Sequence, residues 1–160
     1  MKKYFFSILI LNVFILSAAE AENKQGTGSN VETSTIKVNP YGKFFTDKEK
    51  GISIEMALIE GKNAAGLQDV LLKITGAEAH GEGTDGRVMY YKSVHAGTGA
   101  NFVYQKNGTE SVRMISRDSW GSWKFFEVYV NGKTFKVFPD PDKAKDVKPE
   151  HLLTEYKSAK

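Results

Sequence analysis

The side chains most able to bind a metal ion lie in one glycine-rich stretch. The chain has three histidines, and one of them, His80, lies close to Glu82 and Asp85. Imidazole and carboxylate groups are common ligands of zinc and other divalent metals. The spacing of these residues matches no zinc finger, zincin or EF-hand. We therefore expect a solvated loop without a metal, and His80, Glu82 and Asp85 are the candidate ligands if a metal does bind.

Motifs for catalysis have little support in this sequence. The absence of cysteine excludes a cysteine nucleophile and a cysteine-ligated zinc or iron–sulfur site. No serine lies in a Gly-x-Ser-x-Gly motif, and the glycine pairs at 81–83 and 97–99 lack the residues of a phosphate-binding loop. Glu78, Glu82 and Asp85 supply carboxylates, but a chain of this length has little room for a substrate cleft. We predict that the protein is not an enzyme and needs no cofactor.

The aromatic residues are the more informative candidates. Trp120 and Trp123 flank Gly121 and closely follow Arg117, and Tyr91 lies on another aromatic segment. Tryptophan and arginine are enriched at binding hot spots, although aromatic residues also fill the cores of small β domains. We predict that at least one of the two tryptophans is buried. The candidate binding residues are Trp120, Trp123, Arg117 and Tyr91, with Trp120 as a surface contact.

These candidates would be positioned by an antiparallel sheet. Turn signals recur at even spacing from Thr35 onward, which is typical of all-β domains. Asn107-Gly108 and Asn131-Gly132 each stand between two apolar runs, which predicts two hairpins with type I′ turns. The predicted strands are Thr33 to Val38, ending at Asn39-Pro40, then Ile52 to Leu58, Val88 to Val94, Phe102 to Gln105, Thr109 to Ser116, Trp123 to Val130 and Lys133 to Phe138.

Residues 63–75 fit two structures. Read as a helix, the segment has Asn63 as its N-cap and one apolar face. Read as a strand from about Gln68, its β-branched end alternates in polarity, and Gly66 weakens the helix by roughly 1 kcal/mol relative to alanine. We prefer the strand. The predicted fold is a single β-rich domain over residues 35–160, an antiparallel sandwich or half-open barrel, and the alternative is an α+β fold with this helix.

The C-terminal segment predicts a short helix. Pro149 suits the first helical turn, because its missing N–H is not needed there. Leu152, Leu153 and Tyr156 then recur at helical spacing. We expect a helix at about residues 149–157 that packs on the sheet.

The first 21 residues have the pattern of a signal peptide. Lys2 and Lys3 precede an apolar run from Tyr4 to Leu16, and Ala19-Glu20-Ala21 matches the site that signal peptidase cleaves. The run is too short to cross a hydrocarbon core of roughly 30 Å, although an uncleaved anchor is the alternative. We predict a bacterial protein, periplasmic or secreted, that has no membrane span after cleavage. Residues 22–34 would be a flexible lead-in.

The charge pattern gives no sign of a nucleic-acid partner. The formal net charge of the whole chain is +3 at pH 7, and the basic residues are scattered singly among acids and aromatics. Nucleic-acid binding requires a continuous basic face for phosphate contacts. We therefore expect no nucleic acid among its partners, and the sequence indicates no oligomeric state.

Three hypotheses for function follow. The first is an exported non-catalytic binding protein that recognises another envelope or secreted protein through the aromatic loop or an edge strand. The second is a periplasmic protein that binds a glycan, a lipid or a metal on an aromatic face. The third is a small hydrolase that uses the loop of His80, Glu82 and Asp85. The first fits the small size and the lack of catalytic motifs best.

Overall fold

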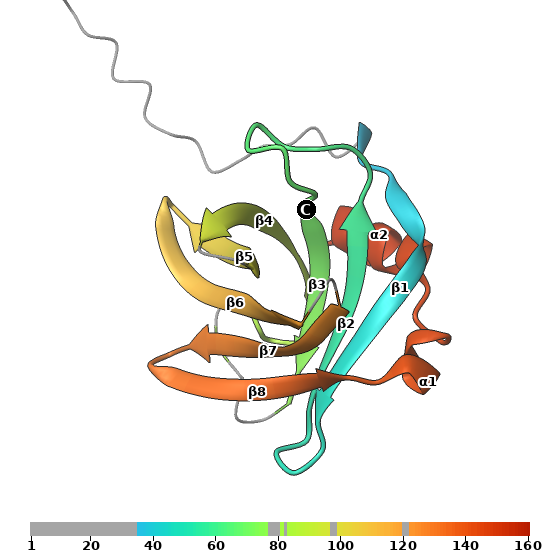
Figure 1. Cartoon of the computed structure of the whole chain (residues 1–160). Helices are drawn as coiled ribbons and strands as arrows, with labels where there is room; N and C mark the ends of the chain where they lie inside the picture. Colours follow the sequence, from blue (N-terminus) through green and yellow to red (C-terminus); the bar gives the residue numbers. More distant parts are fainter. Residues whose placement is uncertain (1–34, 77–80, 82, 97–98, 120–121) are drawn as a thin grey trace, which may run out of the picture.

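The computed structural model describes residues 35–160, apart from 77–80, 82, 97–98 and 120–121, and it contains a closed antiparallel β-barrel (Figure 1). Each strand pairs with the next along the chain, and the last pairs with the first. The strands are β1 (Val38–Asp47), β2 (Ile52–Ile59), β3 (Val70–Thr75), β4 (Val88–Ala96), β5 (Gly99–Lys106), β6 (Thr109–Ser119), β7 (Ser122–Val130) and β8 (Lys133–Pro139). They are followed by the helices α1 (Pro141–Ala144) and α2 (Pro149–Ser158).

The inside of the barrel is a packed apolar core to which every strand contributes. Successive side chains of a strand point to opposite faces, so alternate residues enter the interior. An eight-stranded barrel is just wide enough for its side chains to fill it. The buried interior residues are Phe45, Ile52, Ile54, Met56, Val70, Leu72, Ile74, Tyr91, Phe102, Val112, Met114, Phe126, Val128, Val130, Phe135 and Val137.

A second core lies outside the barrel, under α2. Leu152, Leu153 and Tyr156 of this helix pack on the outward-facing Ala57 and Leu71, and α2 contacts β1, β2, β3 and β4. The prediction of a C-terminal helix that packs on the sheet is therefore confirmed. Figure 1 shows both helices on the β1 side of the barrel, and neither lies over β6, β7 or β8.

Both predicted Asn-Gly turns are confirmed by the backbone. Asn107 and Gly108 have φ angles of 50° and 77°, and Asn131 and Gly132 have φ angles of 51° and 72°. A type I′ turn has positive φ at both central residues, and its backbone twist matches the twist of the paired strands.

The sandwich and the half-open barrel are wrong in detail, since β1 and β8 pair and close the sheet. The prediction that a strand ends at Asn39-Pro40 is also wrong: β1 begins at Val38 and continues past Pro40. The register between β1 and β2 shifts between Val38 and Gly42. Proline has no N–H to donate to a ladder hydrogen bond. It is tolerated at such irregularities because the regular ladder is interrupted there.

The alternative helix at 63–75 is wrong as well, because the side chain of Asn63 closes a turn in its place. Its Oδ1 accepts hydrogen bonds from the backbone N–H groups of Ala65 at 2.9 Å and Leu67 at 3.2 Å. Asparagine side chains compete with helical hydrogen bonding in this way. The preferred strand is confirmed, with β3 beginning at Val70.

A buried carboxylate fixes this turn to the barrel. Asp69 is 8% exposed and accepts hydrogen bonds from Asn63 Nδ2 at 2.6 Å, from the backbone N–H of Ser93 at 2.7 Å and from the hydroxyl of Tyr90. Burial and this hydrogen bond raise the pKa of the Tyr90 hydroxyl. A buried charge is tolerated when its hydrogen bonds are satisfied, as they are here.

We expect Asp69→Ala to lower the free energy of unfolding by about 3 kcal/mol, because each orphaned buried polar group costs roughly 1–3 kcal/mol. Urea denaturation measures this change. The control is Asp146→Ala, at an exposed position, which should change stability by no more than about 0.5 kcal/mol. Equal effects of the two substitutions would contradict the role assigned to Asp69.

Candidate functional site

The barrel closes through an unusually short contact between its first and last strands. β1 and β8 pair only at Phe45 with Pro139 and at Thr46 with Phe138. One further hydrogen bond, from the N–H of Asp140 to the carbonyl of Phe44, has a length of 2.9 Å. By contrast, β7 and β8 pair continuously over the whole range from Lys133 to Val137. We call this short contact the seam.

The first half of β8 is therefore a free sheet edge. The two-residue turn makes Lys133 a hydrogen-bonded partner of Val130, so every second residue from Lys133 directs its backbone N–H and C=O toward β7. Thr134 and Lys136 lie between them and direct their backbone N–H and C=O groups toward β1. Asp140 follows the same alternation, since its N–H donates to the carbonyl of Phe44 on β1. Among the described residues, no ladder or turn hydrogen bond reaches Thr134 or Lys136 from β1.

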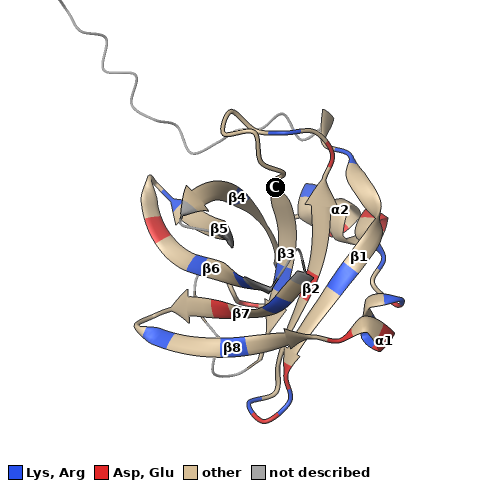
Figure 2. Ribbon diagram, viewed as in Figure 1, with Lys and Arg blue, Asp and Glu red and all other residues tan. Residues whose placement is uncertain are grey.

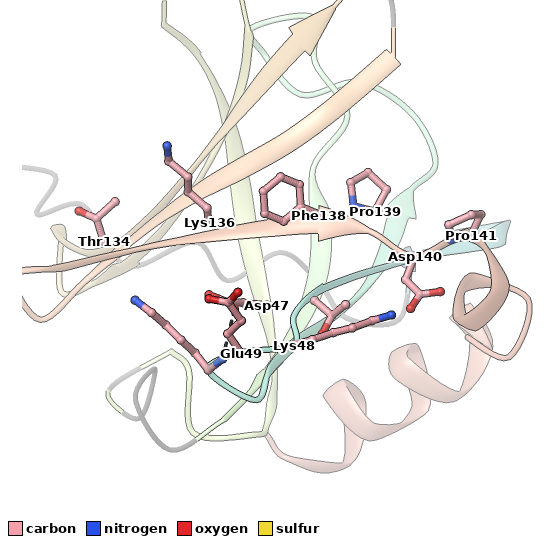
Figure 3. Close-up of a pocket in the computed structure, with 11 residues that line it drawn as sticks. Asp47, Lys48, Glu49, Thr134, Lys136, Phe138, Pro139, Asp140 and Pro141 are labelled. Atoms are coloured by element: carbon pink, nitrogen blue, oxygen red, sulfur yellow. Dashed lines mark hydrogen bonds between the residues drawn. The ribbon is translucent and has the colours of Figure 1, made fainter.

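A hollow of about 880 Å³ lies beside this edge. We call it the hairpin hollow, because the β1–β2 hairpin, residues 46–50, forms one wall and residues 134–141 form the other (Figure 3). Figure 3 shows Asp47 and Lys48 on the hairpin side, and Thr134, Lys136 and Phe138 along the strand. Its charged side chains are Asp47, Lys48, Glu49, Lys50, Lys136 and Asp140, three acidic and three basic.

Aromatic side chains continue from this hollow over the outer face of β7 and β8. Phe138 is 52% exposed, and its ring centroid lies 5.8 Å from that of the half-buried Phe125. The ammonium of Lys136 lies 5.4 Å from the Phe125 ring centroid. Tyr129, which lies on β7 as Phe125 does, is 36% exposed. The edge and this aromatic face form one continuous surface, which we call the β8 surface.

The outer face next to β8 has its charges paired. Arg117 Nε donates to Glu127 Oε2 at 2.9 Å, and the Tyr129 hydroxyl donates to the same oxygen at 3.0 Å. The hydrogen bond from Arg117 lowers the pKa of the Glu127 carboxyl. Figure 2 shows basic and acidic residues interspersed over the strands, with no continuous basic face in this view.

The structure does not bring the binding candidates together. Arg117 lies on the outer face, whereas Trp123 is half-buried and packs on Phe102 and Phe126 in the interior. Tyr91 is fully buried, with its hydroxyl donating to the carbonyl of Gly83 at 2.8 Å, so its side chain does not reach the surface. The aromatic ring of Tyr91 packs in the core because its position on β4 faces the barrel interior. Trp120 lies outside the described residues.

The candidate metal ligands His80 and Glu82 also lie outside the described residues. The third, Asp85, accepts a hydrogen bond from Arg87 Nε at 2.6 Å, and this contact lowers the pKa of its carboxyl. Within the described part of the chain, no three histidine or acidic side chains are grouped so that they could hold a metal ion.

Sequence reasoning missed the residues that form the β8 surface, Thr134, Lys136 and Phe138. It predicted their strand but not that one edge of this strand is free. A signal was present in Pro139, the last residue of β8, because proline within a sheet is largely confined to edge strands, strand starts and bulges.

Comparison of the chain with protein-family models, with curated proteins and with solved structures finds no match in any of the three. Neither helix in the described residues is long and apolar enough to cross a membrane.

The free edge predicts a pattern of amide hydrogen exchange along β8. We expect the amides of Thr134 and Lys136 to exchange at least about a hundredfold faster than those of Phe135 and Val137, which are bonded to β7. Exchange followed residue by residue with NMR tests this. Equal protection of all four amides would show that the edge is paired.

Proposed function

We propose that this chain is an exported bacterial binding protein, without catalytic activity, that recognises an extended segment of another envelope or secreted protein. The observation that carries the proposal is the unpaired backbone of Thr134 and Lys136 beside the hairpin hollow. An extended chain can add to such an edge as a new strand, with main-chain hydrogen bonds supplying affinity.

Side chains around the edge would supply selectivity. Phe138 is an exposed aromatic anchor at one end of the free edge, and Asp47 and Lys136 lie on opposite sides of the hollow. Lysine and proline beside a free edge discourage indiscriminate pairing of strands. The partner segment would therefore need to be complementary to these side chains and not merely extended.

The hydrolase hypothesis has less support in the geometry. Because Arg87 holds the pKa of Asp85 below its ordinary value, this carboxylate is ionised at neutral pH and is unsuited to donate a proton. The small-ligand hypothesis is supported by a different hollow, which is treated separately below.

The binding proposal predicts a photo-crosslink that depends on one backbone N–H. With p-benzoylphenylalanine in place of Phe138, we expect one adduct with an envelope or secreted protein in living cells. Adding Lys136→Pro should reduce its yield about fivefold, because losing one hydrogen bond of roughly 1 kcal/mol weakens binding by about that factor. Proline removes only the N–H directed toward the seam and leaves the ladder with β7 intact.

Lys136→Gln is the matched control, since it removes the same charge but keeps the N–H, and it should lose clearly less of the adduct than Lys136→Pro. The same photoprobe at Tyr41, which is 81% exposed on β1, should not capture this partner. No adduct from Phe138, or equal loss with proline and glutamine, would overturn strand addition at this edge.

Export is tested by the N-terminus of the mature protein. Cleavage after Ala21 would leave Glu22 as the first residue, and mass spectrometry of protein from the envelope or the medium measures this directly. Replacing Ala19 and Ala21 with larger residues should leave the precursor uncleaved. If protein isolated from wild-type cells still begins at Met1, the signal peptide is refuted.

A further inference from the structure

A second hollow, of about 580 Å³, opens on the other side of the seam. It lies where β1 continues beyond the end of β8, so the barrel wall is interrupted. Its walls include Lys43, Phe45, Leu58, Trp123, Pro139 and Ala144. This volume falls within the range of small-molecule sites, about 300–1,000 Å³. We call it the Trp123 hollow.

Lys43 is a basic residue at a strand position that faces the barrel interior. Its partner on β2 is Met56, whose side chain is fully buried in the interior core. Directly opposed residues of paired strands project from the same face of the sheet, so Lys43 projects inward beside Phe45. Its ammonium lies 5.0 Å from the centroid of the Trp123 ring. A charge at an otherwise apolar inner position is a departure that marks functional sites.

The positive charge of Lys43 is not neutralised within the described part of the chain. No described carboxylate lies within ion-pair distance of its ammonium, and its recorded contact is with the Trp123 ring. Asp140 also lines the hollow, but its carboxylate accepts the backbone N–H of Lys143 at 3.1 Å as the N-cap of α1. Among the described residues, the hollow therefore offers one cation that no carboxylate balances.

The apolar floor of the hollow is held rigidly by the core. Trp123 packs edge-on against Phe126 with a centroid separation of 5.3 Å, and its ring lies 6.1 Å from that of Phe45. Phe45 and Phe126 are themselves almost fully buried. A fixed aromatic surface binds a ligand without losing side-chain freedom, which favours affinity.

We propose that the Trp123 hollow binds a small amphiphilic anion, an apolar or aromatic body that carries one carboxylate or sulfonate group. The acidic group would pair with the ammonium of Lys43, and the body would lie on Trp123 and Leu58. The site is separate from the free edge of β8 and goes beyond the proposed recognition of a protein segment.

Titration with the fluorescent anion anilinonaphthalene sulfonate tests the site in the folded mature chain. We expect saturable binding of one molecule to the wild type. Lys43→Met should weaken it at least tenfold, because the ion pair is lost. Lys50→Met is the matched control, since Lys50 lines the hairpin hollow and its ammonium likewise lies 5.1 Å from an aromatic ring centroid, that of the buried Phe135. This control should change the affinity less than twofold.

The neutral analogue phenylnaphthylamine separates charge from apolar contact, and Lys43→Met should bind it as the wild type does. If Lys43→Met does not fold, Ala144→Glu provides the second variant, since it adds a negative charge at the rim of the same hollow and should also weaken binding of the sulfonate. Absence of saturable binding, or equal weakening by Lys43→Met and Lys50→Met, would overturn the proposal. Neither result depends on strand addition at β8, which the crosslink tests independently.

Discussion

Phe45 meets Pro139 and packs edge-on against Phe126 at 4.8 Å where the first strand comes back to the last, and this closure is the constraint on the rest of the molecule. An open meander would expose two sheet edges and one side of an apolar core. Closing it requires the strands to tilt and to be staggered along one another. Here the stagger brings β1 and β8 together only over a short overlap. The remainder of each strand extends past the other, and the two hollows lie there.

Because the barrel interior is filled, a partner or ligand can contact the described residues only from outside, as at the seam or on the outer wall. Large side chains from every strand pack inside the barrel, so the protein's own side chains fill the interior. Outside, α2 covers the wall formed by β1 to β4, and the buried Asp69 network fixes the adjoining turn. The outer face of β7 and β8 is not covered by α2, and there Phe138 and Tyr129 are exposed.

The charged side chains of the described residues differ in how they are paired. Arg117 with Glu127, and Asp85 with Arg87, form close ion pairs that keep these carboxylates ionised. Lys43 differs, because it projects into an aromatic hollow and no carboxylate of the described residues forms an ion pair with it. The two hollows share Pro139, Asp140 and Pro141, so the turn that ends β8 borders both of them.

The sequence by itself determined the elements whose causes are local. The Asn-Gly turns, the alternating strands and the helix at Pro149 were predictable, because positive φ, side-chain alternation and proline geometry act within a few residues. At 63–75 a local cause and a tertiary one act together: the Asn63 side chain closes a turn, and Asp69 accepts the N–H of Ser93 on β4. Closure, the free edge at Thr134 and Lys136, and the inward position of Lys43 also depended on the tertiary structure. Each results from the stagger between strands that are far apart in sequence, and no local pattern encodes the register of that pairing.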